Sequence, residues 1–198
     1  MKLHAIRNHI IFQFVDKTDS KGQFVEETKW GLQITGSFDD SAKLPRWGTV
    51  ISTGPDCADV EPGQQVLIHA LKWTSWFEVD GEKMWRTDES QVAVIRPNAE
   101  AAPRVLGKNV LFKRLDSRID KTNTGLYVVG DSGSSNTPHG KVVIAGPDCE
   151  ETLEFGDIIH FSDANFFSKF VYNDMQLWYI DEQDILAVEE NNSVRSDV

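Results

Sequence analysis

Histidine, cysteine and serine are among the residue types in this chain that could carry out nucleophilic, acid–base or metal chemistry. The five histidines and two cysteines are His4, His9, His69, His139, His160, Cys57 and Cys149. Their spacing gives neither a helical pair of histidines nor the short intervals of a zinc site. We therefore expect no metal site, and we expect most of the histidines to lie at the surface or in strands.

Two further patterns argue against nucleotide and thiol chemistry. The segment Ser132–Ser135 lacks the Lys-Ser/Thr ending of a phosphate-binding loop, and no Gly-x-Gly-x-x-Gly motif follows a strand pattern. Cys57 and Cys149 have no adjacent basic residue that would stabilise a thiolate, so a structural role is favoured over a reactive one. The sequence therefore predicts no cofactor.

The two cysteines mark an internal repeat. The ten residues Gly48–Cys57 align with Gly140–Cys149, and six of the ten positions are identical. Three flanking segments align as well: His9–Phe12 with Asn109–Phe112, Pro62–Ile68 with Phe155–Phe161, and Asp88–Val94 with Asp181–Ala187. We place the first unit at residues 1–98 and the second at residues 104–190, with a short linker between them. Residues 191–198 form a polar tail.

Each unit has the pattern of a small all-β domain. Short apolar runs alternate with turn signals, and no convincing amphipathic helix occurs. The strands expected in the first unit are Ile10–Val15, Gly48–Ser52, Gln65–His69, Trp76–Val79, Lys83–Arg86 and Gln91–Ile95. Asp80-Gly81 predicts a type I′ hairpin turn, because both central residues of that turn need positive φ. Asn173-Asp174 has the same place in the second unit. Many short strands at close spacing predict a small barrel.

A long polar segment interrupts both units. It covers residues 16–47 in the first unit and 116–139 in the second, and each contains one apolar island between glycines. The islands are Gly31–Gly36 and Gly125–Gly130. Such an island could dock its apolar side chains in a partner's groove, or it could form an extra edge strand on its own unit. The residues alone leave these two interpretations equal.

The charge balance limits the possible partners. The chain has 198 residues and a formal net charge of −11, with 20 Lys and Arg against 31 Asp and Glu. This acidity argues against a nucleic-acid or membrane partner, since both need clustered cations. No apolar run approaches the roughly 18 residues of a spanning helix, and the first residues lack a secretion signal. We expect a soluble protein of a reducing, cytoplasmic compartment.

The order of these parts, found twice, resembles the GroES-type co-chaperonin family, whose members form the lid of the group I chaperonin chamber. Each unit has the glycine-flanked apolar loop and then a Gly-x-Val strand, which begins at Gly48 or Gly140. A turn at Gly63 or Gly156 and a hairpin follow. The most specific part is Asp181–Val188, which is very close to the C-terminal strand of the family. The resemblance extends over residues 6–96 and 106–190.

The resemblance implies two tandem GroES-like small β-barrels, each with a long mobile loop that docks on the chaperonin. The chaperonin-binding residues carried over by position are Gly31, Leu32, Gln33, Ile34, Gly125, Leu126, Tyr127 and Val128. The family's loop tripeptide is apolar throughout, whereas its middle residue here is Gln33 or Tyr127. In an extended segment this middle residue points away from the face that the two outer residues share.

The resemblance also implies a biological role. It implies a homo-oligomer that is not an enzyme, whose partners are a group I, GroEL-like chaperonin ring and the substrate proteins enclosed beneath the lid. Only residues 58–61 and 150–154 stand where bacterial lids carry a roof hairpin. This roofless form is similar to the co-chaperonins of tailed bacteriophages, which implies the host bacterial cytoplasm. A two-domain chain does not match a seven-fold ring domain for domain, so a phage virion or assembly component that reuses the fold is the alternative.

Aromatic residues cluster around the hairpin of each unit. Trp85 and Trp178 lie within strand patterns, which favours a place in the core. Four others flank the turns: Trp73, Trp76, Phe166 and Phe167. For these four residues, the sequence is equally compatible with a place in the core and with a contact surface for another protein.

Overall fold

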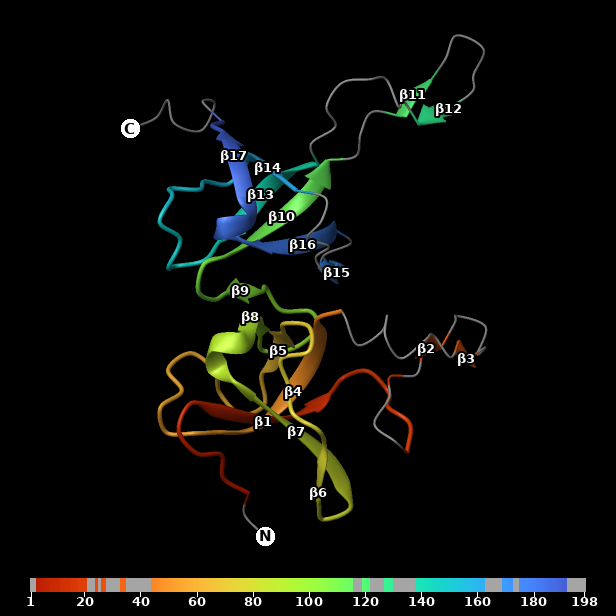
Figure 1. The fold of residues 1–198 in the computed structure, drawn as a ribbon, viewed down its shortest axis with the longest axis vertical. Helices are drawn as coiled ribbons and strands as arrows, with labels where there is room; N and C mark the ends of the chain where they lie inside the picture. Colours follow the sequence, from red (N-terminus) through yellow and green to blue (C-terminus); the bar gives the residue numbers. More distant parts are fainter. Residues whose placement is uncertain are drawn as a thin grey trace. The chain divides into compact units, whose positions relative to one another are not determined.

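The protein is all-β, as the strand patterns predicted (Figure 1). The computed structural model describes residues 3–20, 24, 26–27, 33–34, 44–115, 119–121, 127–129, 138–162, 169–172 and 175–191. The chain divides into two compact units, Met1–Gly107 and Lys108–Val198. The helical elements within the described residues are two single 3-10 turns, η1 (Glu89–Gln91) and η2 (Glu182–Asp184).

The first unit is built on a seven-stranded antiparallel sheet. In order across the sheet, its strands are β6 (Phe77–Val79), β7 (Glu82–Asp88), β1 (His9–Phe14), β4 (Arg46–Thr53), β5 (Gln65–Ile68), β8 (Val92–Arg96) and β9 (Arg104–Val105). A separate two-stranded sheet pairs β2 (Glu26–Glu27) with β3 (Gln33–Ile34). Both strands of this small sheet belong to the long segment between β1 and β4.

The second unit is built on a six-stranded antiparallel sheet. Its strands, in order, are β15 (Lys169–Tyr172), β16 (Met175–Asp181), β10 (Asn109–Leu115), β13 (His139–Ala145), β14 (Ile158–Phe161) and β17 (Ile185–Glu189). A separate two-stranded sheet pairs β11 (Ile119–Lys121) with β12 (Tyr127–Val129). This small sheet lies in the segment between β10 and β13.

The two main sheets repeat one topology. The order β6-β7-β1-β4-β5-β8 in the first unit corresponds, strand by strand, to β15-β16-β10-β13-β14-β17 in the second. The irregularities repeat as well. The pairing of β1 with β4 shifts register between Ile11 and Phe12, and the pairing of β10 with β13 shifts between Leu111 and Phe112. The sequence repeat is therefore also a repeat of structure.

The strands of the first unit form where the sequence predicted them. All six expected strands are present, with bounds that differ by at most two residues from the expected ones. The predicted hairpin turn joins β6 to β7, and Asp80 and Gly81 have φ values of 52° and 84°. Both values are positive, as a type I′ turn requires. The corresponding residues of the second unit, Asn173 and Asp174, lie outside the described residues.

The core of each unit gathers side chains from most strands of its main sheet. In the first unit it contains residues of β1, β4, β5, β7 and β8 together with Val60 and Leu106. Phe12 is fully buried in this core, and Phe112 takes its place in the second unit. A Cβ atom at Gly48 would overlap the ring of Phe12, and one at Gly140 would overlap Phe112. The glycine of the Gly-x-Val strand thus makes room for the central phenylalanine.

The boundary between the units lies further along the chain than the proline-containing linker suggests. The sequence analysis begins the second unit at residue 104, but Arg104 and Val105 form β9 and pair with β8 of the first unit. Leu106 is only 6% exposed and belongs to the core of the first unit. Which strand such a short segment joins depends on residues outside it, so its own sequence does not decide the pairing.

The described strand pairs leave both main sheets open. Within the described ranges, β6 and β9 are the edges of the first sheet, and β15 and β17 are the edges of the second. The structure therefore has two main antiparallel sheets, and most of their strands carry buried residues. The closed barrels expected from the sequence are not among these pairs.

Candidate functional site

The candidate site is the pair of apolar islands. One lies in the segment between β1 and β4, and the other lies in the segment between β10 and β13. Gln33 and Ile34 form β3, and Tyr127 and Val128 lie in β12. The other four predicted residues lie outside the described residues: Gly31, Leu32, Gly125 and Leu126. Each island thus has an extended backbone over the residues that the structure describes.

The islands pair locally. Ile34 lies opposite Glu26 in the first unit, and Val128 lies opposite Asp120 in the second. In the described part of the chain, neither β3 nor β12 pairs with a strand of a main sheet. The interpretation of the islands as extra edge strands of the main sheets therefore does not match the described pairing.

An aromatic cluster anchors the start of the first long segment. The Phe24 ring lies 4.7 Å from Phe14 and 6.1 Å from Trp73, edge to face in both cases. Phe14 also packs edge to face on Trp85, at 4.8 Å. Such pairs stabilise packing beyond the area that they bury. The sequence analysis did not single out Phe24, although an aromatic residue within a polar segment is a usable signal.

Polar contacts fix the same part of the segment. Arg46 at the start of β4 donates to Asp16 at 2.9 Å, and its guanidinium lies 4.4 Å from the centre of the Phe24 ring. Lys83 donates from Nζ to the carbonyl of Asp19. These bonds hold the start of the segment against β4 and β7. The part of the segment that precedes the first island is therefore fixed to the main sheet.

In the second unit, different residue types make the contacts where the long segment joins the main sheet. His139 stacks on His160, with ring centres 5.8 Å apart, and His160 lies 2.8 Å from a carboxylate oxygen of Glu189. In the first unit, Trp47 and Arg96 stand at the positions of His139 and Glu189. Their side chains make a cation–π contact of 3.9 Å. The residues where the two long segments join their sheets have therefore diverged, as the different lengths of the two segments also suggest.

Arg96, which makes this contact in the first unit, is a buried cation. Arg96 is 8% exposed and donates to the side-chain oxygen of Gln65 at 2.9 Å and to the carbonyl of Ala99 at 3.2 Å. Burial lowers the pKa of the Arg96 guanidinium from its ordinary value. The pKa of an arginine starts so high that the group remains a cation at neutral pH.

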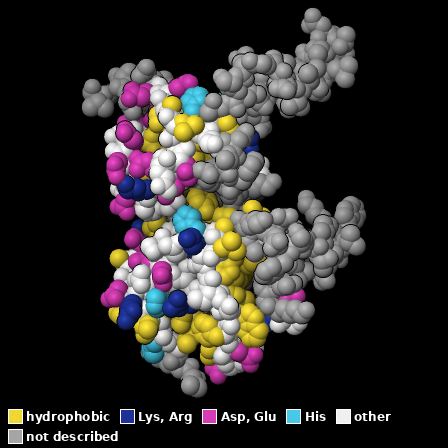
Figure 2. Space-filling view, viewed as in Figure 1, with side chains coloured by type: hydrophobic (Ala, Val, Ile, Leu, Met, Phe, Trp, Pro, Cys, Tyr) yellow, Lys and Arg dark blue, Asp and Glu magenta, His cyan; other side chains and the backbone are white. Residues whose placement is uncertain are grey.

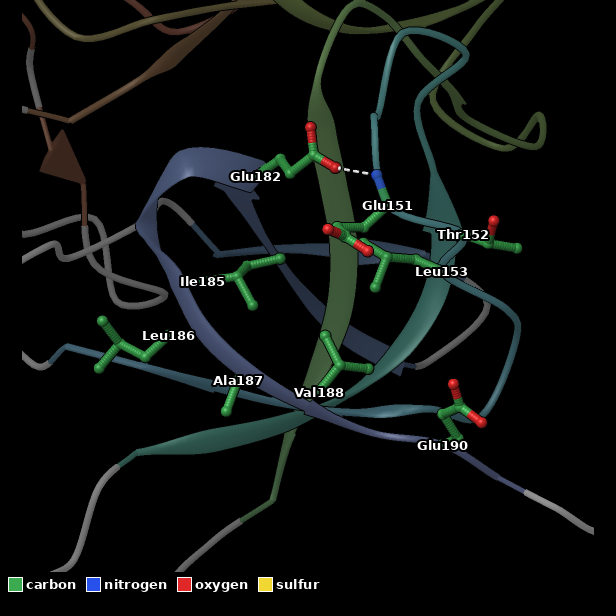
Figure 3. Close-up of a pocket in the computed structure, with 9 residues that line it drawn as sticks. All are labelled: Glu151, Thr152, Leu153, Glu182, Ile185, Leu186, Ala187, Val188 and Glu190. Carbon is green, nitrogen blue, oxygen red and sulfur yellow. Dashed lines mark hydrogen bonds between the residues drawn. The ribbon is translucent and has the colours of Figure 1, made fainter.

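The short connections at residues 58–61 and 150–154 are held by two equivalent glutamates. The Glu89 carboxylate accepts hydrogen bonds from the backbone N–H groups of Ala58, Asp59 and Val60 at 2.8–3.0 Å. Glu182 does the same for Glu150 and Glu151 at 3.0 and 2.7 Å, and Figure 3 shows the bond to Glu151. The sequence analysis aligned these glutamates but assigned them no role. Their equivalent place in the repeat was the signal.

The cysteines fit the structural role that the sequence favoured. Both are half-buried, and their Sγ atoms lie 3.6 Å and 4.0 Å from the backbone oxygens of His9 and Asn109. Burial is the largest cause that raises the pKa of the Cys57 thiol and of the Cys149 thiol. A raised pKa leaves little thiolate at neutral pH, so neither thiol is an activated nucleophile.

The aromatic residues divide between core and surface. Trp85 is 5% exposed in the core, and Trp178 packs against the core of the second unit, as predicted. Trp73 packs against the first core, whereas Trp76 is 38% exposed beside Phe77 at 37%. Figure 2 shows hydrophobic side chains at the surface of the first unit, towards the hairpin of β6 and β7. Phe166 and Phe167 lie outside the described residues.

The other residues considered for metal or phosphate binding do not form a site within the described ranges. His9 lies 2.6 Å from Asp88, and no group of three or more His, Cys, Asp or Glu residues in the described ranges could hold a metal ion. Residues 132–135, which resemble a phosphate loop in composition, lie outside the described residues. Within the part of the chain that the structure describes, no helix has the length and apolar character needed to cross a membrane.

Comparisons with known proteins add no assignment. A search of protein-family models and a search of curated proteins each find no match to this chain. The functional argument therefore depends on the repeat, on the strand topology and on the placement of the islands.

Proposed function

We propose that the protein is a co-chaperonin lid that docks on a group I chaperonin ring through the islands of its two long segments and closes the folding chamber. The observation that carries the proposal is the repeated position of the islands. Each lies in a small two-stranded sheet between the first and second strands of its unit, outside the main sheet. An extended segment of this kind can present alternate side chains to a groove on a partner.

The fold supports the same proposal. Six strands recur in the same order in both units, and one face of each sheet carries a core drawn from most of its strands. We propose that each sheet curls around this core into a small GroES-like barrel. The connections held by Glu89 and Glu182 are short and bonded to the 3-10 turn before the last strand, which supports a lid without a roof hairpin.

The proposal assigns the binding energy to four apolar side chains. Leu32 and Ile34 share one face of the first island if it is extended, and Leu126 and Val128 share one face of the second. Burial of each side chain contributes on the order of 1–3 kcal/mol. Several copies of the lid around one ring raise the affinity further, because the loops then bind as linked sites.

The direct test measures ATP-dependent binding to a purified group I chaperonin. We expect the intact chain to bind, and we expect Leu32→Ser with Ile34→Ser, or Leu126→Ser with Val128→Ser, to reduce binding by at least about tenfold. Gln33→Ser is the matched control, because the middle side chain of an extended island would point away from the face that Leu32 and Ile34 share. Unchanged binding by both double variants would contradict the docking role.

A second measurement distinguishes the co-chaperonin lid from the alternative, a virion or assembly component. If the intact chain does not bind any group I chaperonin but assembles into large particles, the proposal fails and a virion or assembly component is favoured. Native mass measurement of the assembly, with and without the chaperonin, distinguishes these results.

A further inference from the structure

The two long segments differ in length, and most of the difference lies before the island. Glu26 and Asp120 are equivalent residues, because each pairs with the last residue of its island's tripeptide. Ten residues separate Glu26 from Val15 in the first unit, whereas four separate Asp120 from Leu115, the equivalent of Val15, which is a difference of six. The first unit therefore has additional chain between its first strand and its island.

In this stretch the chain of the first unit turns back to the main sheet. A β-bridge pairs Thr18 with Phe24. The Phe24 ring lies edge to face on Phe14 and Trp73, with ring centres 4.7 Å and 6.1 Å apart. Phe14 and Trp73 both pack against the core of the first unit. The ring of Phe24 is therefore held on the body of the unit, ahead of the island.

Arg46 contacts the same ring from the other end of the long segment. Its side chain is 12% exposed, and its guanidinium lies 4.4 Å from the centre of the Phe24 ring. It also donates to the carboxylate of Asp16 at 2.9 Å. A buried cation is favourable only with such partners, so it fixes their positions. We call Asp16, Phe24 and Arg46 the clip, because they join the two ends of the segment.

The sequence of the second unit has no equivalent of the clip or of Phe14. The residues at the positions of Phe14, Phe24 and Arg46 are Arg114, Arg118 and Pro138. The first two carry a cation in place of an aromatic ring, and proline has no cation for a ring or a carboxylate. Six strands of the main sheet nevertheless recur in the same order in both units. The clip is therefore not a requirement of the fold, so its role concerns the long segment.

The clip lies close to the first island along the chain. Glu26 follows Phe24 by two residues, which an extended backbone spans in at most about 7 Å. Glu26 in turn lies opposite Ile34. A fixed Phe24 ring therefore restricts the positions that Ile34 can take. Gln33 and Ile34 already have the extended backbone that a groove-binding segment needs, and a segment ordered in its bound form loses less entropy on binding.

We propose that Phe24 is a positioning residue: the clip orders the first island for docking, so the first island binds the chaperonin more tightly than the second. This inference rests on the proposed docking function and names the island that dominates it. If only a fraction of the free chains holds the island ready, the apparent affinity falls by that fraction. Loss of the clip then slows association and leaves dissociation unchanged, because the contacts with the partner stay the same.

Stopped-flow binding to a purified group I chaperonin with ATP tests this role. We expect Phe24→Ala to slow association at least about threefold and to change dissociation little. Phe24→Tyr should restore the association rate, because it keeps the ring that Phe14 and Arg46 contact. Ile34→Ser, which removes a contact with the partner, should instead speed dissociation. Unchanged association or faster dissociation of Phe24→Ala, or no rescue by Phe24→Tyr, overturns the proposal.

A cycle of variants shows through which island the clip acts. The effect of Phe24→Ala should persist with Leu126→Ser and Val128→Ser, which remove the apolar contacts of the second island. It should vanish with Leu32→Ser and Ile34→Ser, which remove those of the first. The first-island pair alone should also weaken binding more than the second-island pair. Equal effects of Phe24→Ala in both backgrounds would mean a general destabilisation and would overturn the proposal.

Asp16→Ala tests the clip without a change in the aromatic cluster. The Asp16 side chain is 44% exposed, so its removal leaves the core in place but takes one partner from Arg46. We expect slower association than that of the intact chain, with a smaller effect than that of Phe24→Ala. Association of Asp16→Ala at the intact rate overturns the proposed clip.

Hydrogen exchange of the free chain needs no chaperonin. Peptides that contain the first island should exchange faster in Phe24→Ala than in the intact chain, while peptides of the second island stay unchanged. Phe77→Ala is the matched control, because Phe77 is a 37% exposed aromatic residue on β6, outside the clip. Unchanged exchange in the first island overturns the clip. An intact chain that binds no chaperonin overturns the docking function, even where the exchange result shows that the clip orders the island.

Discussion

The carboxylate of Glu89 accepts a hydrogen bond from the backbone N–H of Asp59 at 2.8 Å, and Glu182 binds Glu151 in the same way at 2.7 Å. The bonds join residues about thirty positions apart in each unit, so they close the turn that follows the Gly-Pro-Asp-Cys segment onto the start of η1 or η2. The turn is thereby fixed to the 3-10 turn that precedes the last strand of each unit.

Removal of the Glu89 carboxylate should destabilise the first unit. Glu89→Ala leaves three backbone N–H groups to water, and we expect a loss of about 1–2 kcal/mol, because hydrogen bonds to a charged acceptor are the stronger kind. Glu182→Ala should cost less, since two N–H groups are bonded there. Urea unfolding measures both, with Ser90→Ala as the exposed control. A larger loss at Glu182 would contradict this account.

Gly48→Ala should destabilise the protein through a clash rather than through backbone strain. The new Cβ overlaps the fully buried ring of Phe12, and overpacking of this kind costs about 1–3 kcal/mol. Ile51→Ala, at an exposed position of the same strand, should cost less. The cost of Gly48→Ala should shrink in a Phe12→Leu background, because the smaller side chain leaves space. Additive effects in thermal unfolding would exclude the clash as the cause.

Tyr179 should make stability fall at alkaline pH. The side chain is 5% exposed, and burial raises the pKa of the Tyr179 phenol well above its ordinary value. The neutral phenol is thus the form that the folded state favours. Its contribution is complete below the unfolded pKa of about 10 and declines as the pH rises above that value.

The measurement is the melting temperature between pH 8 and pH 11. Tyr179→Phe should show a shallower decline than the intact chain over this range, since phenylalanine has no proton to lose. Tyr172→Phe is the control, because Tyr172 is half-buried. Equal slopes for the intact chain and Tyr179→Phe would contradict the assignment.

Both cysteines should react slowly with alkylating reagents at neutral pH. Burial raises the pKa of each thiol, so the thiolate fraction at pH 7 is below that of free cysteine, and half-burial adds steric protection. We expect iodoacetamide to modify Cys57 and Cys149 more slowly than glutathione at pH 7, with rates that still rise above pH 9. Mass spectrometry of time points measures this. Modification faster than that of glutathione would indicate an activated thiol.

Much of the fold could be predicted from the sequence because its signals are local. Alternating apolar residues between turn signals predicted the six strands of the first unit, and Asp80-Gly81 predicted the hairpin. The duplicated Gly-Pro-Asp-Cys segment predicted two units. The islands were also visible, because glycines flank short apolar runs within polar sequence.

The tertiary structure decided which of these parts meet. β9 joins β8 of the first unit, Phe24 returns to the cluster around Phe14, and Glu89 closes on Asp59. Each contact joins segments whose own residues are compatible with several partners, so no local pattern specifies it. The sequence by itself determined an acidic, duplicated β protein with two apolar islands. Only the packing of distant strands decided that β9 covers β8 while no strand of the described residues covers the equivalent edge of β17, because strand pairing depends on backbone groups that every residue shares.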